Sequence, residues 1–253
     1  MNYQMKDKVA LVIGGGGGSG RISAQMFAQE GCKVVVADIS EEEAKKTADL
    51  IAADGGVAVY IKCDVTKEGD IEATVNLAET TYGKLNFALN IVGTNTDFTE
   101  LANVPSKNFD VMFNVNTRST FLGMKYEIAA MQKAGGGSIV NMASAGGLVG
   151  QYKQGLYNPT KFAVVGMTKA AALDYAKDNI RVNCICPGPM LSAGMQAALN
   201  KDPHFGDQYL TGIPLNRFIG QEEVASAFLY LCSEKAAAIT GVALPVDGGM
   251  VAD

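Results

Sequence analysis

Short apolar runs rich in β-branched residues alternate with longer helix-compatible stretches along the whole chain, and this alternation limits the folds available to it. The runs have almost no polar positions, which is typical of parallel strands covered by helices on both faces. Predicted strands cover residues 9–13, 33–37, 58–62, 86–91, 137–141, 181–186 and 242–246. The sequence therefore predicts an α/β fold: a doubly wound, seven-stranded, mostly parallel sheet.

The stretches between the strands carry helical patterns, with helices predicted at 21–30, 41–53, 67–82, 106–132, 155–177 and 221–233. Ser40 followed by Glu43 predicts a capping box at the start of the second helix. Prolines and glycines interrupt the helical pattern at about 187–213, and a long irregular segment in a compact domain is usually functional. We expect one domain spanning residues 1–253, with a substrate-loop insertion at about 187–213.

Composition and charge exclude several classes of protein. A net charge of -5 disfavours nucleic-acid binding, because such a surface repels phosphates. Charged residues within the first dozen positions leave neither a secretion signal nor a membrane span there. The five cysteines mostly lie in apolar segments, which predicts free thiols in a reducing cytoplasm. A single histidine, His204, leaves little material for a histidine metal site or a Ser-His-Asp triad, so no metal is expected.

A glycine-rich turn, Gly14 to Gly20, follows the first predicted strand and precedes a helix expected to begin at Arg21. Glycines there allow the backbone to approach a pyrophosphate, which the helix N-terminus attracts. Gly14, Gly18 and Gly20 fit the spacing GxxxGxG best, with Ser19 between the last two. This context predicts a dinucleotide-binding turn of the Rossmann type.

Acidic residues end the next two predicted strands. Asp38 stands about 20 positions past the glycine turn, where a carboxylate holds the adenosine ribose hydroxyls and repels a 2′-phosphate. Asp38, followed by Ile39, therefore favours NAD over NADP; the alternative is a surface residue that caps the next helix. Asp64 and Val65 follow the third strand and are candidates to border the adenine.

Tyr157 and Lys161 are four residues apart, so on a helix they share one face. A phenol serves as a base near neutral pH only if its pKa falls by about three units, which requires roughly 4 kcal/mol. One ammonium about 4 Å away supplies an interaction of about that size at an effective dielectric constant of 20. The same spacing occurs by chance in many helices, so the surrounding residues decide its meaning.

Those surroundings resemble the short-chain dehydrogenase/reductase family over nearly the full length of the chain. Asn90-Ile91-Val92-Gly93 is similar to the family's Asn-Asn-Ala-Gly motif, keeping its first and last members. Asn116 and Ser144 stand where the family has catalytic residues. Further matches are the glycine turn, with Ile13 in place of the usual threonine, Pro187-Gly188-Pro189 with a later Ser192 in place of threonine, and the segment Thr240 to Gly249.

The resemblance implies roles for individual residues. Tyr157 would be the general base or acid, Lys161 would lower the tyrosine pKa and hold the nicotinamide ribose, and Ser144 would bind the substrate oxygen. Asn116 would hold a water that passes protons to solvent. The implied cofactor-binding residues are Gly14, Gly18, Ser19, Gly20, Asp38, Ile39, Asp64, Val65, Asn90, Gly93, Tyr157, Lys161, Pro187, Gly188, Met190 and Ser192.

We therefore expect a cytoplasmic, NAD-dependent oxidoreductase that moves a hydride between the cofactor and a secondary alcohol or ketone. Methionines and aromatic residues of the insertion favour a hydrophobic or cyclic substrate. The alternative is that they only pack the insertion, as a lid, onto its own domain. The resemblance also suggests a homotetramer, and the apolar helices at 109–131 and 163–175 agree.

Two alternatives remain. The first is an NADP-dependent ketone or 3-oxoacyl thioester reductase, which is disfavoured by Asp38 and by Ser19 where a basic residue would be expected. A basic residue, Arg21, does follow Gly20, but it could simply face solvent. A non-catalytic dinucleotide-binding module has no chemical need for Asn116, Ser144, Tyr157 and Lys161 together.

Overall fold

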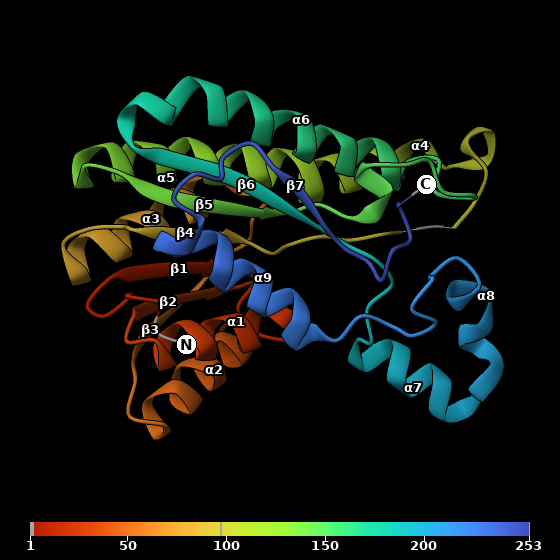
Figure 1. Ribbon diagram of the computed structural model, residues 1–253, viewed down its shortest axis with the longest axis horizontal. Coiled ribbons are helices and arrows are strands. Elements are labelled where there is room, and N and C mark those ends of the chain that lie inside the picture. Colours follow the sequence, from red (N-terminus) through yellow and green to blue (C-terminus); the bar gives the residue numbers. More distant parts are fainter. Residues whose placement is uncertain (1–2, 97, 253) are drawn as a thin grey trace.

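The computed structural model describes residues 3–96 and 98–252. Within these residues, seven strands form one sheet in the order β3-β2-β1-β4-β5-β6-β7, and every neighbouring pair is parallel (Figure 1). The strands are β1 (Val9–Ile13), β2 (Lys33–Asp38), β3 (Val57–Lys62), β4 (Phe87–Asn90), β5 (Gly137–Met142), β6 (Ile180–Pro187) and β7 (Ala243–Val246). The predicted doubly wound fold is confirmed.

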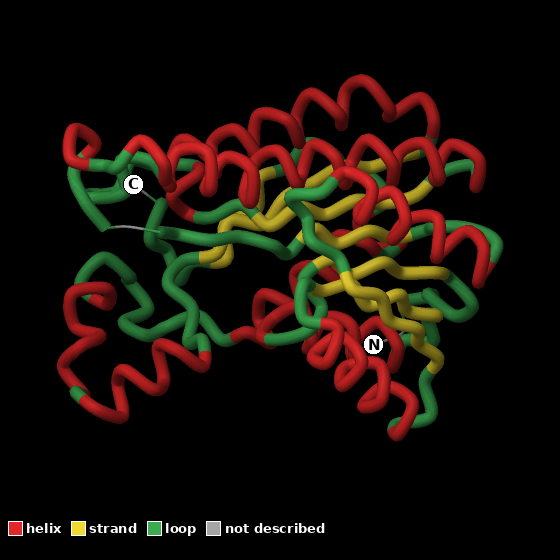
Figure 2. Tube along the Cα trace, turned by 180° about the vertical axis from the view of Figure 1, so that it is seen from behind, coloured by secondary structure: helices red, strands yellow, loops and turns green. Residues whose placement is uncertain are grey.

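Helices cover both faces of the sheet (Figures 1 and 2). One face carries α1 (Gly18–Gln29), α2 (Glu41–Ala53) and α9 (Gln221–Cys232); the other carries α3 (Glu68–Tyr82), α5 (Ser119–Ala134) and α6 (Tyr157–Tyr175). Successive strand residues point to opposite faces, so β1 contributes Leu11 to the core beneath α3 and α5 and Val12 to the core beneath α1 and α9. This double burial explains why β1 contains only apolar residues.

The chain adds strands to one side of β1 up to β3 and then to its other side from β4, so β1 pairs with β2 on one side and β4 on the other. Ligands of open parallel sheets bind at such a switch point, outside the carboxyl ends of the strands. At this end of the sheet the segment after β6 forms α7 (Ala193–Lys201), a short turn at Pro203–Gly206 and α8 (Asp207–Leu210), set apart from the main body (Figure 1).

Three local predictions were wrong. Helix α1 begins at Gly18 and not at Arg21, because the last glycines of the turn already belong to its first helical turn. The helix predicted at 106–132 is divided into α4 (Ser106–Met112), a π-helical turn (Phe113–Arg118) and α5. The capping box is half formed: Ser40 Oγ accepts from Glu43 N at 3.3 Å, but Ser40 N donates to Asp38. Among the described residues, no helix is both long and apolar enough to cross a membrane.

Candidate active site

A cleft of about 590 Å³ lies at the carboxyl ends of the strands. It brings together most of the residues that the sequence analysis singled out. Its walls are Gly14, Gly17, Gly18, Ser19, Gly20, Ile91, Gly93, Thr94, Asn95, Met142, Ala143, Ser144, Tyr157, Lys161, Pro187, Gly188, Met190, Ser192, Ala193, Gly194 and Gln221.

The glycine turn forms one wall, and its register is the one inferred from the sequence. Gly14 and Gly18 have positive φ angles of 89° and 53°, which favour glycine. A Cβ on Gly20 would lie 2.0 Å from Gly14 O, so only glycine allows α1 to begin directly over the turn. Gly17 is the N-cap and provides no side chain for the first amides of α1, which therefore fit a pyrophosphate.

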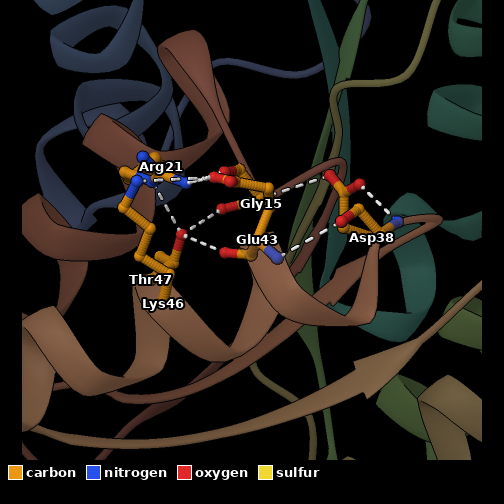
Figure 3. A network of polar contacts seen from close by, with 8 residues as sticks. Gly15, Arg21, Asp38, Glu43, Lys46 and Thr47 are labelled. Atoms are coloured by element: carbon orange, nitrogen blue, oxygen red, sulfur yellow. Dashed lines mark hydrogen bonds and ion pairs between the residues drawn. The ribbon is translucent and has the colours of Figure 1, made fainter.

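Asp38, at the end of β2, is held against the back of this turn (Figure 3). Its Oδ2 accepts from Gly16 N at 2.9 Å and its Oδ1 accepts from Ser40 N at 3.1 Å. A Cβ on Gly16 would lie 2.6 Å from Asp38 Cγ, so this glycine makes room for the carboxylate. The next residue, Ile39, is 65% exposed, as a residue flanking an adenosine site could be.

Five residues predicted to bind the cofactor do not line the cleft: Asp38 and Ile39, described above, and Asp64, Val65 and Asn90. Asp64 Oδ1 accepts from Thr66 N and Thr66 Oγ1, which lowers the pKa of Asp64, and its Oδ2 lies 3.4 Å from Lys67 Nζ. Val65 is buried in the core. Asn90 is buried too, and its Nδ2 donates to Glu127 Oε2 at 3.1 Å and to Asn141 Oδ1 at 2.9 Å, so it joins β4 to its neighbours beneath the cleft.

The opposite wall holds Ser144, Tyr157 and Lys161. Ser144 follows β5, and its Oγ accepts from Gly146 N at 3.2 Å. Helix α6 begins at Tyr157, so Lys161 lies one turn further on the same face. Lys161 is 2% exposed, and its Nζ donates to Met142 O at 3.1 Å and lies 5.8 Å from the centre of the Tyr157 ring.

The expected lowering of the Tyr157 pKa by Lys161 is absent from this structure. Burial raises the pKa of Tyr157, and only the hydrogen bond with Ser144 opposes that rise. Lys161 is itself desolvated, which lowers its pKa to about 8. Its ammonium bonds the main chain and not the phenol, so in this state Tyr157 is a neutral acid with its proton in place.

Asn116 lies in the π-helical turn, is fully buried and does not line the cleft. Its Oδ1 accepts from Thr94 N at 2.7 Å, and its Nδ2 donates to Thr94 O at 2.8 Å and Thr160 Oγ1 at 3.0 Å. The side chain therefore ties the segment after β4 to α6. It fixes Thr94, which lines the cleft, and the expected role of Asn116 in holding a water stays a prediction.

The end of β6 and the segment after it close the cleft through Pro187, Gly188, Met190 and Ser192, and Ser192 also caps α7. Of the methionines, leucines and aromatic residues of the insertion, only Met190 lines the cleft within the part of the chain that the structure describes. Phe205 and Tyr209 have ring centres 6.2 Å apart, and Tyr209 lies 6.5 Å from Phe218. These contacts join the aromatic side chains of the insertion to Phe218, which lies just beyond it.

Sequence reasoning missed several wall residues, among them Thr94, Asn95 and Gln221. Gln221 begins α9, and its Nε2 donates to Leu191 O at 2.9 Å, while its Oε1 lies beside Gly18. Asn95 Nδ2 donates to Gln154 Oε1 at 2.8 Å. No local pattern marks these residues, because only the packing of distant segments brings them to the cleft.

The fold and this cleft define a dinucleotide-binding oxidoreductase. A family model described as "Enoyl-(Acyl carrier protein) reductase" matches residues 16–251. The chain is 39% identical to a 2,5-dichloro-2,5-cyclohexadiene-1,4-diol dehydrogenase of Sphingobium indicum, covering 98% of each chain. It is 36% identical to a cyclohexanol dehydrogenase of Acinetobacter sp., covering 98% of this chain and 96% of that one.

A solved structure of 7α-hydroxysteroid dehydrogenase, complexed with NADH and 7-oxo glycochenodeoxycholic acid, superposes with a TM-score of 0.91. It shares 30% sequence identity, and the alignment covers 98% of this chain and 96% of that one. The chain belongs to the short-chain dehydrogenase/reductase family. It is an oxidoreductase that acts on CH–OH donors with a nicotinamide dinucleotide cofactor.

Proposed function

We propose that the protein is an NAD-dependent dehydrogenase that interconverts a hydrophobic or cyclic secondary alcohol and its ketone. One observation carries this proposal: Ser144, Tyr157 and Lys161 share a cleft with the uncapped first turn of α1. The relatives named for cyclohexanol and for a cyclic diol support a ring-shaped substrate.

The residues of the glycine turn would hold the pyrophosphate, and Gly93, Pro187, Gly188, Met190 and Ser192 would border the nicotinamide half. Bound there, the cofactor supplies the hydride donor or acceptor. Ser144 Oγ hydrogen-bonds the substrate oxygen and steadies its developing charge. Tyr157 Oη donates its proton to that oxygen in reduction and accepts it in oxidation.

Lys161 and Asn116 act around this proton transfer. The Lys161 ammonium stabilises the phenolate that remains after Tyr157 has given up its proton, and can also donate to a ribose hydroxyl. Asn116 positions Thr94 and α6, so that Tyr157 keeps its place in the wall.

The choice of NAD rests on Asp38. Its carboxylate is fixed behind the glycine turn by Gly16 N and Ser40 N, where it can accept from ribose hydroxyls and repel a 2′-phosphate. Asp64 and Val65 do not line the cleft and would at most border the adenine.

We also propose that residues 1–253 act as one catalytic unit, with 187–213 as its substrate loop, and that four copies assemble. Exposed apolar side chains on α4, α5 and α6 support self-association: Phe109, Phe121, Phe162 and Leu173 are 46–83% exposed. All five cysteines are free thiols, which supports a cytoplasmic location.

A panel of alcohols, followed by NADH or NADPH absorbance, tests the enzymatic proposal. Cyclohexanol and cyclic diols should be oxidised with NAD faster than with NADP. Turnover confined to small charged hydroxy acids would contradict the substrate class, and equal rates with NADP would contradict the cofactor. Light scattering at micromolar concentration tests the assembly, and a monomer would contradict it.

A further inference from the structure

Arg21 does not face solvent, although it follows the glycine turn on an outer helix. Its side chain is 21% exposed and lies between α1 and α2, against the turn (Figure 3). Nε donates to Thr47 Oγ1 at 2.9 Å, and Nη2 bonds both Gly16 O and Glu43 Oε2. We call Arg21, Glu43 and Thr47 the loop clamp.

The loop clamp and Asp38 hold the same piece of backbone from two sides. Gly16 N donates to Asp38 Oδ2 at 2.9 Å, while Gly16 O accepts from Arg21. Thr47 Oγ1 also donates to Gly15 O at 2.9 Å. A single glycine therefore separates the Arg21 guanidinium from the carboxylate that marks the ribose site.

The loop clamp and the neighbouring Asp38 and Lys46 carry two positive and two negative charges, which balance. Arg21 and Lys46 are positive, Asp38 and Glu43 are negative, and Glu43 Oε2 lies 4.0 Å from Lys46 Nζ in addition to its bond with Arg21. The hydrogen bond from Arg21 lowers the pKa of Glu43 below its ordinary value. Arg21 and Lys46 both contact Glu43, so a 2′-phosphate, with nearly two negative charges, would have to compete with Glu43 for them.

A guanidinium is otherwise well suited to a phosphate, because its planar N–H groups bind phosphate oxygens in pairs. In this chain Glu43 and Gly16 O already occupy that donor edge. Glu43 is free for this contact because Asp38 takes the Ser40 amide that a complete capping box would give to Glu43.

We propose that Glu43 is a second determinant of cofactor choice: it holds Arg21 against the glycine turn and withholds this guanidinium from a 2′-phosphate. The inference rests on the proposed role of Asp38 and extends it. Loss of the Asp38 charge removes a repulsion of the 2′-phosphate. Loss of the Glu43 charge in addition frees the Arg21 guanidinium to attract that phosphate.

Binding of NADH and NADPH to the full-length protein without substrate, measured by isothermal titration calorimetry, tests this. The variants are D38A, D38A/E43Q, D38A/E42Q and D38A/E43Q/R21Q. Glu42 is the matched control, since it lies in the same helical turn, carries the same charge and is exposed. We expect E43Q to tighten NADPH about threefold to tenfold over D38A, less so at high salt. The affinity for NADH should stay within about twofold. Adding E42Q to D38A should change NADPH affinity little, and adding R21Q to D38A/E43Q should cancel the gain in NADPH affinity.

An equal effect of E43Q and E42Q on NADPH affinity would overturn the proposal, because it would show that the effect comes from long-range charge and not from the loop clamp. So would a parallel change for NADH and NADPH, which would show a loosened turn. NADH binding itself verifies that each variant is folded. The D38A variant alone tests the proposed function: if it discriminates as the parent does, Asp38 is not the selector, while E43Q against E42Q still decides the role of Glu43.

Discussion

Lys161 Nζ donates to Met142 O at 3.1 Å and lies 5.8 Å from the centre of the Tyr157 ring. The main chain at the end of β5 therefore fixes the ammonium under the cleft, and Ser144 is the polar neighbour of the phenol. Burial raises the pKa of Tyr157 and lowers that of Lys161, so each group favours its neutral form. This arrangement leads to the first two predictions.

Tyr157→Phe should remove the proton donor and little else. We expect kcat to fall about 10²- to 10⁴-fold, the range for loss of a general acid–base group, while NADH affinity stays within about threefold. Steady-state kinetics and calorimetry measure the two quantities. Tyr152→Phe is the control, because Tyr152 is 81% exposed and does not line the cleft. A Tyr157→Phe enzyme with more than about a tenth of the parent's turnover would contradict the mechanism.

Lys161→Met should abolish turnover and raise stability in a pH-dependent way. The folded-state pKa of about 8 is below the ordinary lysine value of 10.5, so the unfolded chain binds more protons between these values. The parent therefore gains stability as pH rises through this window and loses it as pH falls. Chemical denaturation should show the variant's advantage shrinking by at most roughly 1.4 kcal/mol per pH unit from pH 8 to 10. A constant difference would show that Lys161 does not titrate in this way.

The sheet could be predicted from the sequence because double burial leaves a direct mark: strands such as β1 contain only apolar residues. The register of the glycine turn was also predictable, since backbone contact at Gly20 permits no side chain. Side-chain contacts across the fold leave no such mark. Gln221 is far from Gly18 in the chain, and the capture of Glu43 by Arg21 overrides the local capping pattern of Ser40 and Glu43. Asn116, in the π-helical turn, likewise bonds Thr94 and Thr160, which lie far from it in the chain.

Gly16→Ala should weaken NAD binding although Gly16 is outside the GxxxGxG positions. The new Cβ would lie 2.6 Å from Asp38 Cγ and 2.7 Å from Asp38 Oδ2, so the carboxylate must leave its place. We expect NADH affinity to fall about tenfold, equivalent to one lost charge-assisted hydrogen bond. The preference for NAD over NADP should fall with it. Gly69→Ala, in α3 with open space around it, is the control for calorimetric titration. Unchanged NADH affinity would show that Asp38 tolerates displacement.

From the buried carboxyl group of Glu127 we expect a contribution to the free energy of unfolding that falls as pH rises. It is fully buried on α5, its Oε2 accepts from Asn90 Nδ2 at 3.1 Å, and its Oε1 has no hydrogen-bond partner among the residues that the structure describes. Burial raises its pKa from 4.5 to about 8, so the folded protein holds a proton that the unfolded chain releases near pH 4.5. The stabilisation from this proton is complete below pH 4.5 and is lost as pH rises towards 8.

Glu127→Gln keeps the shape of the side chain and removes the titration. Between pH 5 and 8, the parent should lose stability relative to this variant by at most roughly 1.4 kcal/mol per pH unit, as measured by urea denaturation. Glu72→Gln, which removes an exposed carboxylate on α3, should show no comparable trend. A parent and a Glu127→Gln variant with parallel pH profiles would mean that Glu127 is already ionised in the folded protein. Its charge would then need a partner that this arrangement of Asn90, Asn141 and Thr168 does not supply.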